Sequence, residues 1–523
     1  MDSPESKNRA SSDVGFTPVL IIGAGASGIA MAYQLKHQLG YSDFRVVERQ
    51  SGIGGSWWSN RYPGACDVPT ASYSFSFAPY YTSTRLYPTG DEFQKYLESV
   101  AKRFKLSSKI EFDTEVSSLR WIESDSQWEA TLTHFAPGIG DLSTRERDEK
   151  IAKNGALVLR KETIRARAVV SCVGILVEPN PWPSSIPGRD NFKGPVFHTA
   201  RWNADVDLDG KNVVVIGAGC SAAQVVPSLL VEPYNVKSVT QIMRQAPWVM
   251  PRLEEPFGKE KFAKYAPTVL KYFPILGWMY RMAIHWLVEL ILATVIQAKN
   301  VKWRKGLEAS TLKRTLELIP EKYHTMMTPD YPYGCKRRVF DSDWLMSMNK
   351  PNFALENRKI TAVHEQGLTL GAPYNKSTDN TNEKNIPADV IILANGFEAT
   401  RWLHPLSVVG RNGSSLQDTW NQRGGPQAYM GIAIDGFPNF FIAMGPNSAN
   451  GTHSLILTSE NMAIYIAKTI RPLLEGDVTT IEVKKEAVSS WTQEIKQGLL
   501  KTVFVGCTSW YMDKEGYNST LYP

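Results

Sequence analysis

The chain has 523 residues, of which 43% are hydrophobic and 21% are charged, as is usual for a soluble globular protein. It is too long for one ordinary domain, and its length indicates about two to four. The net charge of +6 is mild and no stretch is densely basic, so a nucleic-acid partner is not expected.

The N-terminal residues 1–15 are polar and lack the apolar segment of a secretory signal, so we expect a disordered tail there. The cysteines lie far apart and form no CxxC pair. They are Cys66, Cys172, Cys220, Cys335 and Cys507. We expect unpaired thiols in a reducing compartment, and therefore a cytoplasmic protein.

Residues 18–48 predict a strand, a glycine turn, a helix and a second strand, which together form a βαβ unit of a parallel sheet. The turn matches GxGxxG through Gly23, Gly25 and Gly28. Such a turn places a pyrophosphate at the helix N-terminus, where free N–H groups and the helix dipole favour anions. Glu48 ends the second strand, where a carboxylate can bind the ribose hydroxyls. This unit is predicted to bind FAD.

The region after this unit is rich in predicted strands. Residues 128–135 and 156–174 have the composition of strands in a meander. The polar residues 136–155 between them predict a solvent-exposed loop. The proline-rich residues 180–188 then predict a connector between two domains.

A second βαβ unit begins at Lys211, and its turn matches GxGxxA, with Gly217, Gly219 and Ser221 in the turn. Its second strand ends in Arg244 instead of an acid. An acid would repel a 2′-phosphate, whereas an arginine can bind it through two hydrogen bonds. This unit is predicted to bind NADPH, which can deliver a hydride to a flavin.

Residues 252–330 have a mainly helical pattern, and residues 275–296 within them are strongly apolar. Arg281, His285 and Glu289 interrupt this apolar stretch at a spacing of four, which places them on one helical face. A membrane-spanning helix should be nearly free of charge. We therefore expect an amphipathic helix in a soluble domain, whose polar face could be solvated, and contact with a membrane surface is the alternative.

Residues 389–397 predict another buried strand that ends in a glycine turn, after a polar insert at residues 375–385. The expected fold is α/β, with two Rossmann-like dinucleotide-binding domains, one for FAD and one for NADPH, and a helical insertion. The predicted parts are an FAD-binding domain at 16–180 and 385–523, an NADPH-binding domain at 181–251 and 331–384, and a helical subdomain at 252–330.

The connector carries the motif that discriminates among flavoproteins with two dinucleotide sites. Disulfide reductases need a redox-active cysteine pair near the flavin, and the cysteine spacing suggests none. The connector instead matches FxGxxxHxxxW at Phe192, Gly194, His198 and Trp202. From residue 18 onward the chain resembles the type I Baeyer–Villiger monooxygenases, which are class B flavoprotein monooxygenases, and its nearest likeness is to fungal members of secondary metabolism. Related enzymes that oxidise heteroatoms carry Phe or Tyr in place of this tryptophan, and Asn203 departs from the usual Pro or Asp.

Further segments are similar to family motifs. Residues 54–57, with Gly55 and Trp57, resemble the start of a fingerprint beside the flavin, which ends in an aspartate, here Asp67. Residues 509–511 resemble the segment whose tryptophan, here Trp510, touches the nicotinamide cofactor and the substrate pocket. Asn395 stands where the family usually has the threonine of a Thr-Gly turn over the flavin.

Residues 333–337 resemble the family segment that holds the catalytic arginine, here Arg337. The resemblance implies that NADPH reduces FAD, that the reduced flavin reacts with O₂, and that oxygen enters beside a ketone carbonyl to give an ester or lactone. A permanently charged guanidinium suits the anions of this reaction, and Asp67 is expected to hold it in place. Lys336 is expected to contact the 2′-phosphate of NADPH, and His198 to organise the connector.

Two alternatives stay open. A flavin monooxygenase could instead perform N- or S-oxygenation, epoxidation or hydroxylation, or oxidise NADPH without a product. The segment from Gly64 to Asp67 is one residue shorter than the family pattern, which leaves open a degenerate, non-catalytic flavoprotein.

Overall fold

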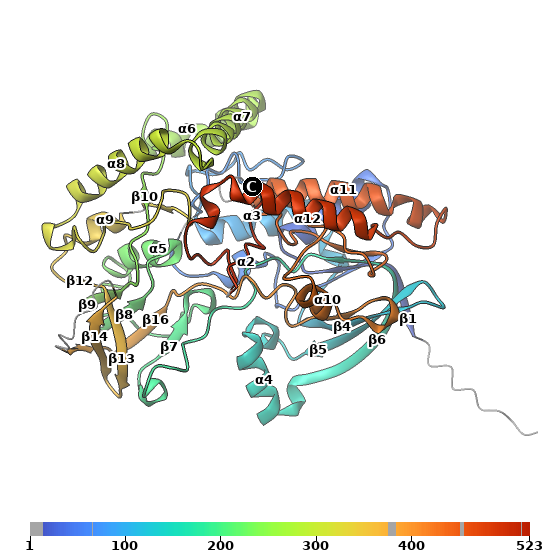
Figure 1. The fold of residues 1–523 in the computed structure, drawn as a ribbon, viewed down its shortest axis with the longest axis horizontal. Coiled ribbons are helices and arrows are strands. Elements are labelled where there is room, and N and C mark those ends of the chain that lie inside the picture. Colours follow the sequence, from blue (N-terminus) through green and yellow to red (C-terminus); the bar gives the residue numbers. More distant parts are fainter. Residues whose placement is uncertain (1–13, 65, 342, 375–382, 450–453, 514) are drawn as a thin grey trace, which may run out of the picture.

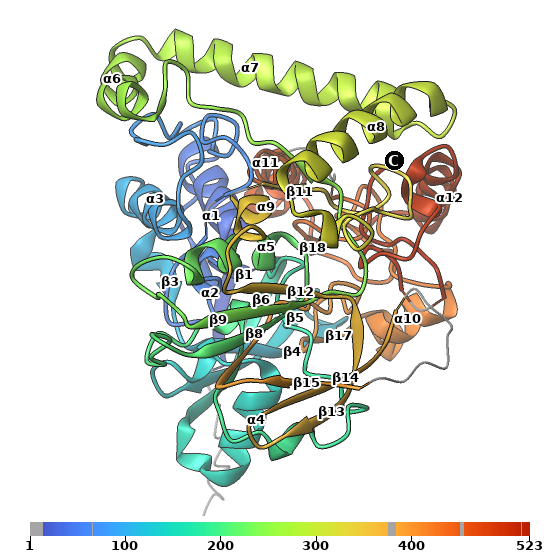
Figure 2. The ribbon, with the colours of Figure 1, turned by 90° about the vertical axis from the view of Figure 1, so that its left-hand side faces the viewer.

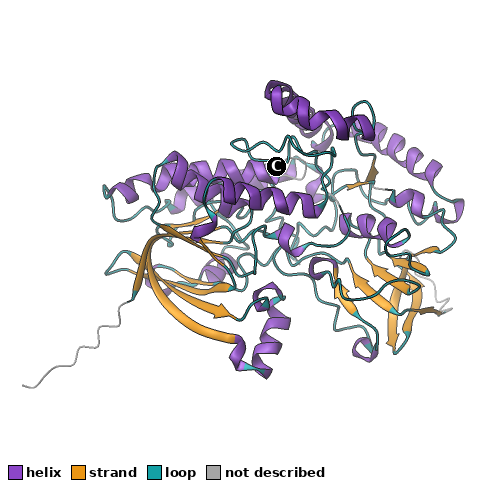
Figure 3. Ribbon diagram, turned by 180° about the vertical axis from the view of Figure 1, so that it is seen from behind, coloured by secondary structure: helices purple, strands orange, loops and turns teal. Residues whose placement is uncertain are grey.

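The computed structural model describes residues 14–523 except 65, 342, 375–382, 450–453 and 514. Its strands gather in two groups that lie side by side, and long helices run above both groups in the views of Figures 1 and 3. The tail expected at residues 1–15, apart from its last two residues, and most of the polar insert expected at 375–385 lie outside the described residues.

The larger sheet has eight strands and is centred on the first βαβ unit. Strand β1 (Gly15–Ile22) pairs in parallel with β2 (Phe44–Val47) and with β6 (Val158–Ser171). The other strands are β3 (Ile110–Glu111), β4 (Thr114–Ile122), β5 (Gln127–Phe135), β17 (Ser407–Val409) and β18 (Phe440–Ile442). Because β4, β5 and β6 pair antiparallel in chain order, they form the meander that the sequence predicts.

Helices cover the larger sheet and bury its apolar side chains. Helix α1 (Ala26–Tyr33) packs on α11 (Leu455–Glu475), and both join a core with α3 (Gly90–Arg103). Helix α3 begins with a capping box, in which Thr89 and Glu92 each bind the other's backbone N–H. The remaining helices of this half are α2 (Ser56–Ser59), α10 (Leu416–Gln422) and α12 (Lys485–Leu500).

The prediction of a solvent-exposed loop at residues 136–155 is wrong, because the segment contains helix α4 (Thr144–Lys153). Ser143 and Glu146 form a capping box at its start, which is a local signal for a helix N-terminus. Arg147 on this helix is 2% exposed and pairs with Glu115 of the sheet at 2.8 Å. The helix is therefore anchored to the sheet by a buried ion pair as well as by its cap.

The second sheet has five parallel strands in the order β12-β9-β8-β16-β7. They are β12 (Phe353–Glu356), β9 (Ser238–Ile242), β8 (Asn212–Ile216), β16 (Val390–Leu393) and β7 (Val196–His198). Helices α5 (Cys220–Leu229) and α9 (Trp344–Ser347) share a core with one face. The other face shares a core with the antiparallel sheet of β13 (Arg358–His364), β14 (Gly367–Pro373) and β15 (Lys384–Pro387).

The position of strand β16 shows that the predicted domain boundary at residue 385 is wrong. The strand pairs in parallel with β8 and β7, so a boundary at residue 385 assigns it to the wrong sheet. The chain returns to the larger sheet only after Leu393. The sequence pattern predicts the strand itself, but its partner strands come from distant segments and are not encoded locally.

Three helices form a separate layer along the top of the molecule in Figure 2. They are α6 (Lys259–Tyr272), α7 (Pro274–Ile291) and α8 (Val301–Leu318), in the region expected to be helical. A short parallel pair, β10 (Val249–Met250) with β11 (Val339–Phe340), lies where the chain enters and leaves this layer.

Candidate active site

The first glycine turn lies at the carboxyl end of β1 and lines a cavity in the larger domain. Gly23 has φ +106°, and a Cβ there would lie 2.6 Å from the carbonyl oxygen of Cys172. A Cβ on Gly28 would lie 1.9 Å from the carbonyl oxygen of Gly23. A Cβ on Gly25 would lie 3.4 Å from the Cα of Gly55, and both glycines line the cavity. The turn therefore needs its glycines for the bend and for close packing, and it leaves a cradle of backbone N–H groups.

Glu48 lies in the same cavity, at the end of β2. Its carboxylate accepts hydrogen bonds from the backbone N–H groups of Ala24 at 2.6 Å and of Gln50 at 2.8 Å. Burial raises the pKa of Glu48, although these two bonds favour the ionised form. The carboxylate thus ties the glycine turn to the second strand, and Trp57 and Gly55 line the same space.

The second glycine turn has the same design with one difference. Gly217 has φ +132°, and a Cβ there would lie 2.2 Å from the carbonyl oxygen of Ala394 on the neighbouring chain segment. A Cβ on Gly219 would meet nothing within 4 Å, so the turn is open on that side. Ser221 donates a hydrogen bond to the Tyr62 hydroxyl at 3.3 Å, which joins this turn to the larger domain. The open side at Gly219 fits a pyrophosphate.

Two cations meet beside this turn. Arg244 is exposed two residues after the end of β9, and Lys336 contacts the side-chain oxygen of Gln245. Burial lowers the pKa of Lys336, and the positive charge of Arg244 lowers it further. The two side chains are thus close enough to repel each other. A pair of adjacent cations at this edge fits an anionic group such as a 2′-phosphate.

The connector motif packs on the second sheet from both sides. Phe192 enters the core under the small antiparallel sheet, and Trp202 stands edge-on to Phe197 at 5.3 Å on the other face. A Cβ on Gly194 would lie 2.2 Å from the carbonyl oxygen of Asp389, so only glycine allows this approach. The motif residues therefore fix the connector to the second sheet.

His198 ends β7 and is 7% exposed. Its Nδ1 accepts a hydrogen bond from the N–H of Ala200 at 2.9 Å, and its ring stands edge-on to Phe397 at 5.7 Å. Burial, with a smaller effect of Arg201, lowers the pKa of His198 to about 4. It is therefore neutral near pH 7 and lies against the turn at Asn395, which agrees with an organising role for this histidine.

Arg337 and Asp67 meet although 270 residues separate them in sequence, with 2.5 Å between Nη2 and Oδ2. The negative charge of Asp67 raises the pKa of Arg337. Burial alone would raise the pKa of Asp67, but Arg337 holds it below its ordinary value. Both side chains line a cavity of about 1240 Å³ that extends to α7. The shortened segment before Asp67 therefore does not prevent its contact with the arginine.

The two cavities adjoin, because Tyr73 and Leu455 line both of them. The ion pair of Arg337 and Asp67 is thus in the larger cavity, next to the cavity of the first glycine turn. This arrangement brings a fixed positive charge close to the site predicted for the flavin.

Sequence reasoning missed several residues of this site. Arg252 lies near enough to lower the pKa of Asp67 further, and its Nε and Nη2 are buried without a partner among the described residues. Of the two neighbouring rings, Tyr511 is buried and Trp510 is not. Burial raises the pKa of Tyr511 to about 12, and the nearby positive charge of Arg337 acts in the opposite direction. Trp510 is 39% exposed, its ring lies 4.3 Å from that of Tyr511 at a tilt of 45°, and it does not line either of these two cavities. Arg252 and Tyr511 are recognised as residues of this site only from their contacts in the folded structure, because no sequence motif marks them.

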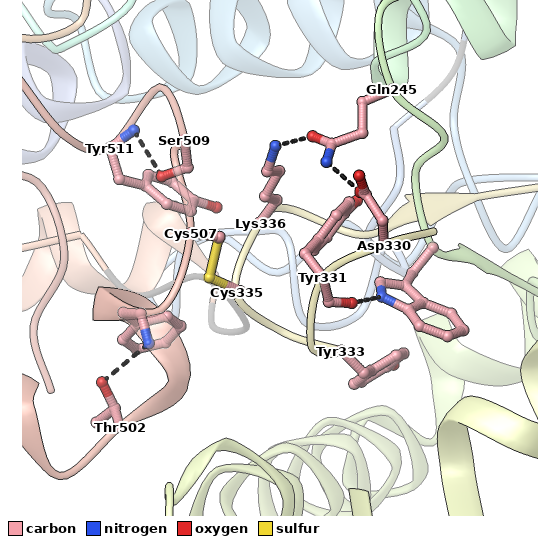
Figure 4. Close-up of a disulfide and its surroundings, with 12 residues drawn as sticks. Gln245, Asp330, Tyr331, Tyr333, Cys335, Lys336, Thr502, Cys507, Ser509 and Tyr511 are labelled. Carbon is pink, nitrogen blue, oxygen red and sulfur yellow. Dashed lines mark hydrogen bonds between the residues drawn. A yellow bond between two sulfur atoms is a disulfide. The ribbon is translucent and has the colours of Figure 1, made fainter. Parts of the chain in front are cut away.

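The prediction that all five cysteines are unpaired is wrong for two of them. Cys335 and Cys507 form a disulfide, with 6.2 Å between their Cα atoms (Figure 4). It joins the segment of Lys336 and Arg337 to the C-terminal segment of Tyr511, and 172 residues separate the two cysteines. Neither cysteine lines the two cavities described above, so the disulfide does not face the site predicted for the flavin. The wide spacing explains why the sequence gives no hint of the pair.

Residues 17–261 match the model of the flavin-binding monooxygenase-like family. A Baeyer–Villiger monooxygenase of Streptomyces coelicolor is 34% identical over 97% of this chain and 88% of its own length. The chain belongs to the Baeyer–Villiger monooxygenase family. Another relative, the FAD-binding monooxygenase ktnD of Aspergillus niger, is 30% identical over 100% of this chain and 81% of its own.

Solved structures agree with this membership. A steroid monooxygenase bound to NADP superposes with a TM-score of 0.76 at 27% identity, over 97% of this chain and 94% of that one. The closed form of cyclohexanone monooxygenase has a TM-score of 0.75 at 24% identity over the same shares, which shows the likeness of fold. The predicted family and α/β fold class are thus confirmed, and the predicted cofactors, FAD and NADPH, are those of the family.

Proposed function

We propose that this flavin monooxygenase inserts one oxygen atom from O₂ beside the carbonyl group of a small-molecule ketone, giving an ester or a lactone. The observation that carries the proposal is the ion pair of Arg337 and Asp67 in a large cavity that adjoins the first glycine turn. The lining of this cavity is mostly apolar, so an apolar ketone fits it better than a charged substrate.

The glycine turns supply the two cofactor sites. Gly23, Gly25 and Glu48 would hold FAD in the first cavity. The open side of the second turn at Gly219, together with Arg244 and Lys336, would hold NADPH. Bound FAD, reduced by NADPH, would supply the activated oxygen.

Arg337 would stabilise negative charge on the reacting oxygen atoms. Asp67 raises its pKa further, so it stays charged and cannot serve as a proton donor at any working pH. The carboxylate also restrains the guanidinium at 2.5 Å, so that little reorganisation is needed when charge develops. A lysine at this position could lose its proton on burial, which would remove the stabilising charge.

The test is a product screen with the purified full-length protein. A yellow preparation should consume NADPH and add one oxygen atom to members of a ketone panel, detected as an ester or lactone by mass spectrometry. Thioethers run side by side give the comparison. Sulfoxide formation with no ketone conversion would assign the enzyme to heteroatom oxygenation. NADPH consumption with hydrogen peroxide as the sole product would indicate oxidation of NADPH without oxygen transfer, and a flavin-loaded protein that consumes no NADPH would indicate a non-catalytic flavoprotein.

The role in secondary metabolism and the cytoplasmic location expected from the sequence stay predictions. The Aspergillus niger relative supports a fungal setting for such enzymes, but its name states FAD binding and monooxygenation alone.

A further inference from the structure

The amphipathic pattern of α7 is inverted relative to that of a helix on a soluble protein. Arg281 is 8% exposed, and it lines the large cavity together with His285. On the opposite side of the helix, Ile275, Met279 and Trp286 are 58%, 56% and 69% exposed. At 100° per residue these three lie within about 40° of one another, and about 120–160° from Arg281. Arg281 thus faces the protein, whereas the side chains of His285 and Glu289 are 35% and 45% exposed, so the polar face is solvated only in part.

Apolar exposure continues on the helices beside α7. Tyr265 and Tyr272 of α6, Phe273 between the two helices, and Trp303 of α8 are each more than half exposed. In Figures 1 and 2 the three helices form one layer along the outer edge of the molecule. We call this region the α6–α8 surface. An exposed apolar area of this extent marks an interaction site.

Lysines surround the apolar side chains of the α6–α8 surface. The exposed ones are Lys259, Lys261, Lys264 and Lys271 on α6, and Lys299, Lys302 and Lys305 at the start of α8. Glu260 is the exposed acid in this range of described residues, and Glu289 lies 4.0 Å from His285. The surface therefore combines aromatic and aliphatic side chains with a strong positive charge, which matches the interface of an anionic lipid bilayer.

We propose that the α6–α8 surface docks the protein on an anionic membrane, with α7 lying in the plane of the bilayer. By length and composition one described helix, Pro274–Ile296, could cross a membrane, and 19% of its apolar 18-residue window is buried. One side of it, however, packs on the protein, since a Cβ on Gly277 would lie 2.4 Å from the Tyr81 ring. A helix bound along its side in this way lies on a membrane and does not span it.

A second copy of the chain fits the α6–α8 surface less well. A two-fold contact would place this surface against itself and bring its lysines together, and facing like charges oppose association. Anionic lipid headgroups neutralise the same charges. The docking does not depend on the reaction, but because α7 also lines the cavity of Arg337, docking would deliver a lipid-soluble ketone to the proposed function.

The experiment measures sedimentation of the flavin-loaded full-length protein with lipid vesicles, without NADPH or substrate. We expect binding to phosphatidylcholine vesicles that contain phosphatidylglycerol, weaker binding to phosphatidylcholine alone, and a loss of binding as salt is raised. The double variant Met279→Glu/Trp286→Glu should bind roughly a hundredfold more weakly. Lys259→Gln/Lys264→Gln should reduce binding to the anionic vesicles roughly 30-fold.

The control is Leu159→Glu, which replaces a side chain that is 63% exposed on β6, a strand of the opposite side in Figure 1. It should bind like the unsubstituted protein, and all variants should keep their flavin, which reports an intact fold. Equal vesicle binding by the Met279→Glu/Trp286→Glu variant would overturn the proposal. Absence of binding to anionic vesicles would also overturn it. If the unsubstituted protein is a dimer and this variant is a monomer, the surface binds a second copy of the chain instead. Because no turnover is involved, a failed ketone screen leaves the vesicle result unaffected.

Discussion

At the residue scale, the fixed charge of Arg337 decides what the large cavity can do. Among the described residues its ion-pair partner is Asp67, and the pair lies in a cavity that is otherwise mostly apolar. A charge held in such surroundings acts more strongly on a reacting group than it would in water. A single substitution in this pair should therefore impair oxygen transfer without impairing reduction of the flavin.

The first prediction concerns Arg337→Ala. We expect ester or lactone formation to fall by about 10²–10³-fold, because the developing negative charge loses its stabilising cation. Reduction of the flavin by NADPH should persist, and anaerobic stopped-flow bleaching of the flavin absorbance measures it. Arg160→Ala, which removes a 60% exposed arginine side chain, is the matched control. If the Arg337→Ala variant still makes ester at the normal rate, the assigned role is wrong.

The second prediction uses the buried, neutral His198. Its pKa is about 4 in the folded protein and near 6.5 in an unfolded chain. Between these values the unfolded state binds more protons, so the folded state loses stability as pH falls from about 6.5 to about 4. The contribution is at most about 3 kcal/mol, since one pKa unit corresponds to about 1.4 kcal/mol.

Urea unfolding at pH 7 and at pH 5 measures this effect. His198→Gln should show a smaller decrease in the free energy of unfolding between the two pH values than the unsubstituted protein does. The reverse order would contradict a buried neutral histidine. His37, whose ring lies at the surface and contacts the carbonyl of Phe104, offers the control substitution His37→Gln.

At the element scale, the two glycine turns are the part of the site that the sequence predicts best. Each turn follows its strand and starts its helix within a few residues, so spacing alone carries the geometry. The capping box of α4 is equally local, and its Ser143 and Glu146 could have predicted the helix that was mistaken for a loop. A structural feature can thus be predicted from the sequence when all the residues that determine it lie within a few positions of one another.

The third prediction separates two kinds of glycine. Gly219→Ala places a methyl group in open space where the NADPH pyrophosphate is proposed to bind, so the KM for NADPH should rise about tenfold with no change in Tm. Gly28→Ala instead meets the carbonyl oxygen of Gly23 at 1.9 Å, so it should cost about 1–3 kcal/mol of stability and reduce flavin content.

Steady-state kinetics, thermal unfolding and flavin absorbance distinguish these outcomes. Gly155→Ala is the control, because a Cβ there meets nothing within 4 Å. A lower Tm without a change in KM for Gly219→Ala would contradict an open cofactor cradle at that turn.

At the scale of the whole molecule, the disulfide of Cys335 and Cys507 joins the segment of the proposed catalytic arginine to the C-terminal segment. Because it closes a loop of more than a hundred residues, it limits the freedom of the unfolded chain more than a short loop would. It also holds Tyr511 and Arg337 in neighbouring segments, although each belongs to a different part of the fold.

The fourth prediction follows from this link. Alkylation of the denatured, unreduced protein should label three thiols, those of Cys66, Cys172 and Cys220, and five after reduction. The double variant Cys335→Ser/Cys507→Ser should lose about 2–4 kcal/mol of stability in urea unfolding. Labelling of five thiols without a reductant would show that the disulfide does not form. Cys66→Ser, which removes a buried free thiol, is the control for the substitution itself.

The sequence by itself determined both dinucleotide-binding turns, the connector motif and the family of this monooxygenase. These features depend on residues close together in the chain, whose spacing sets strand, turn and helix directly. The contact of Arg337 with Asp67, the disulfide, the place of β16 in the second sheet and the outward apolar side of α7 were decided by the tertiary structure. Each of these requires segments far apart in the chain to meet, and local spacing carries no information about which distant surfaces will pack together.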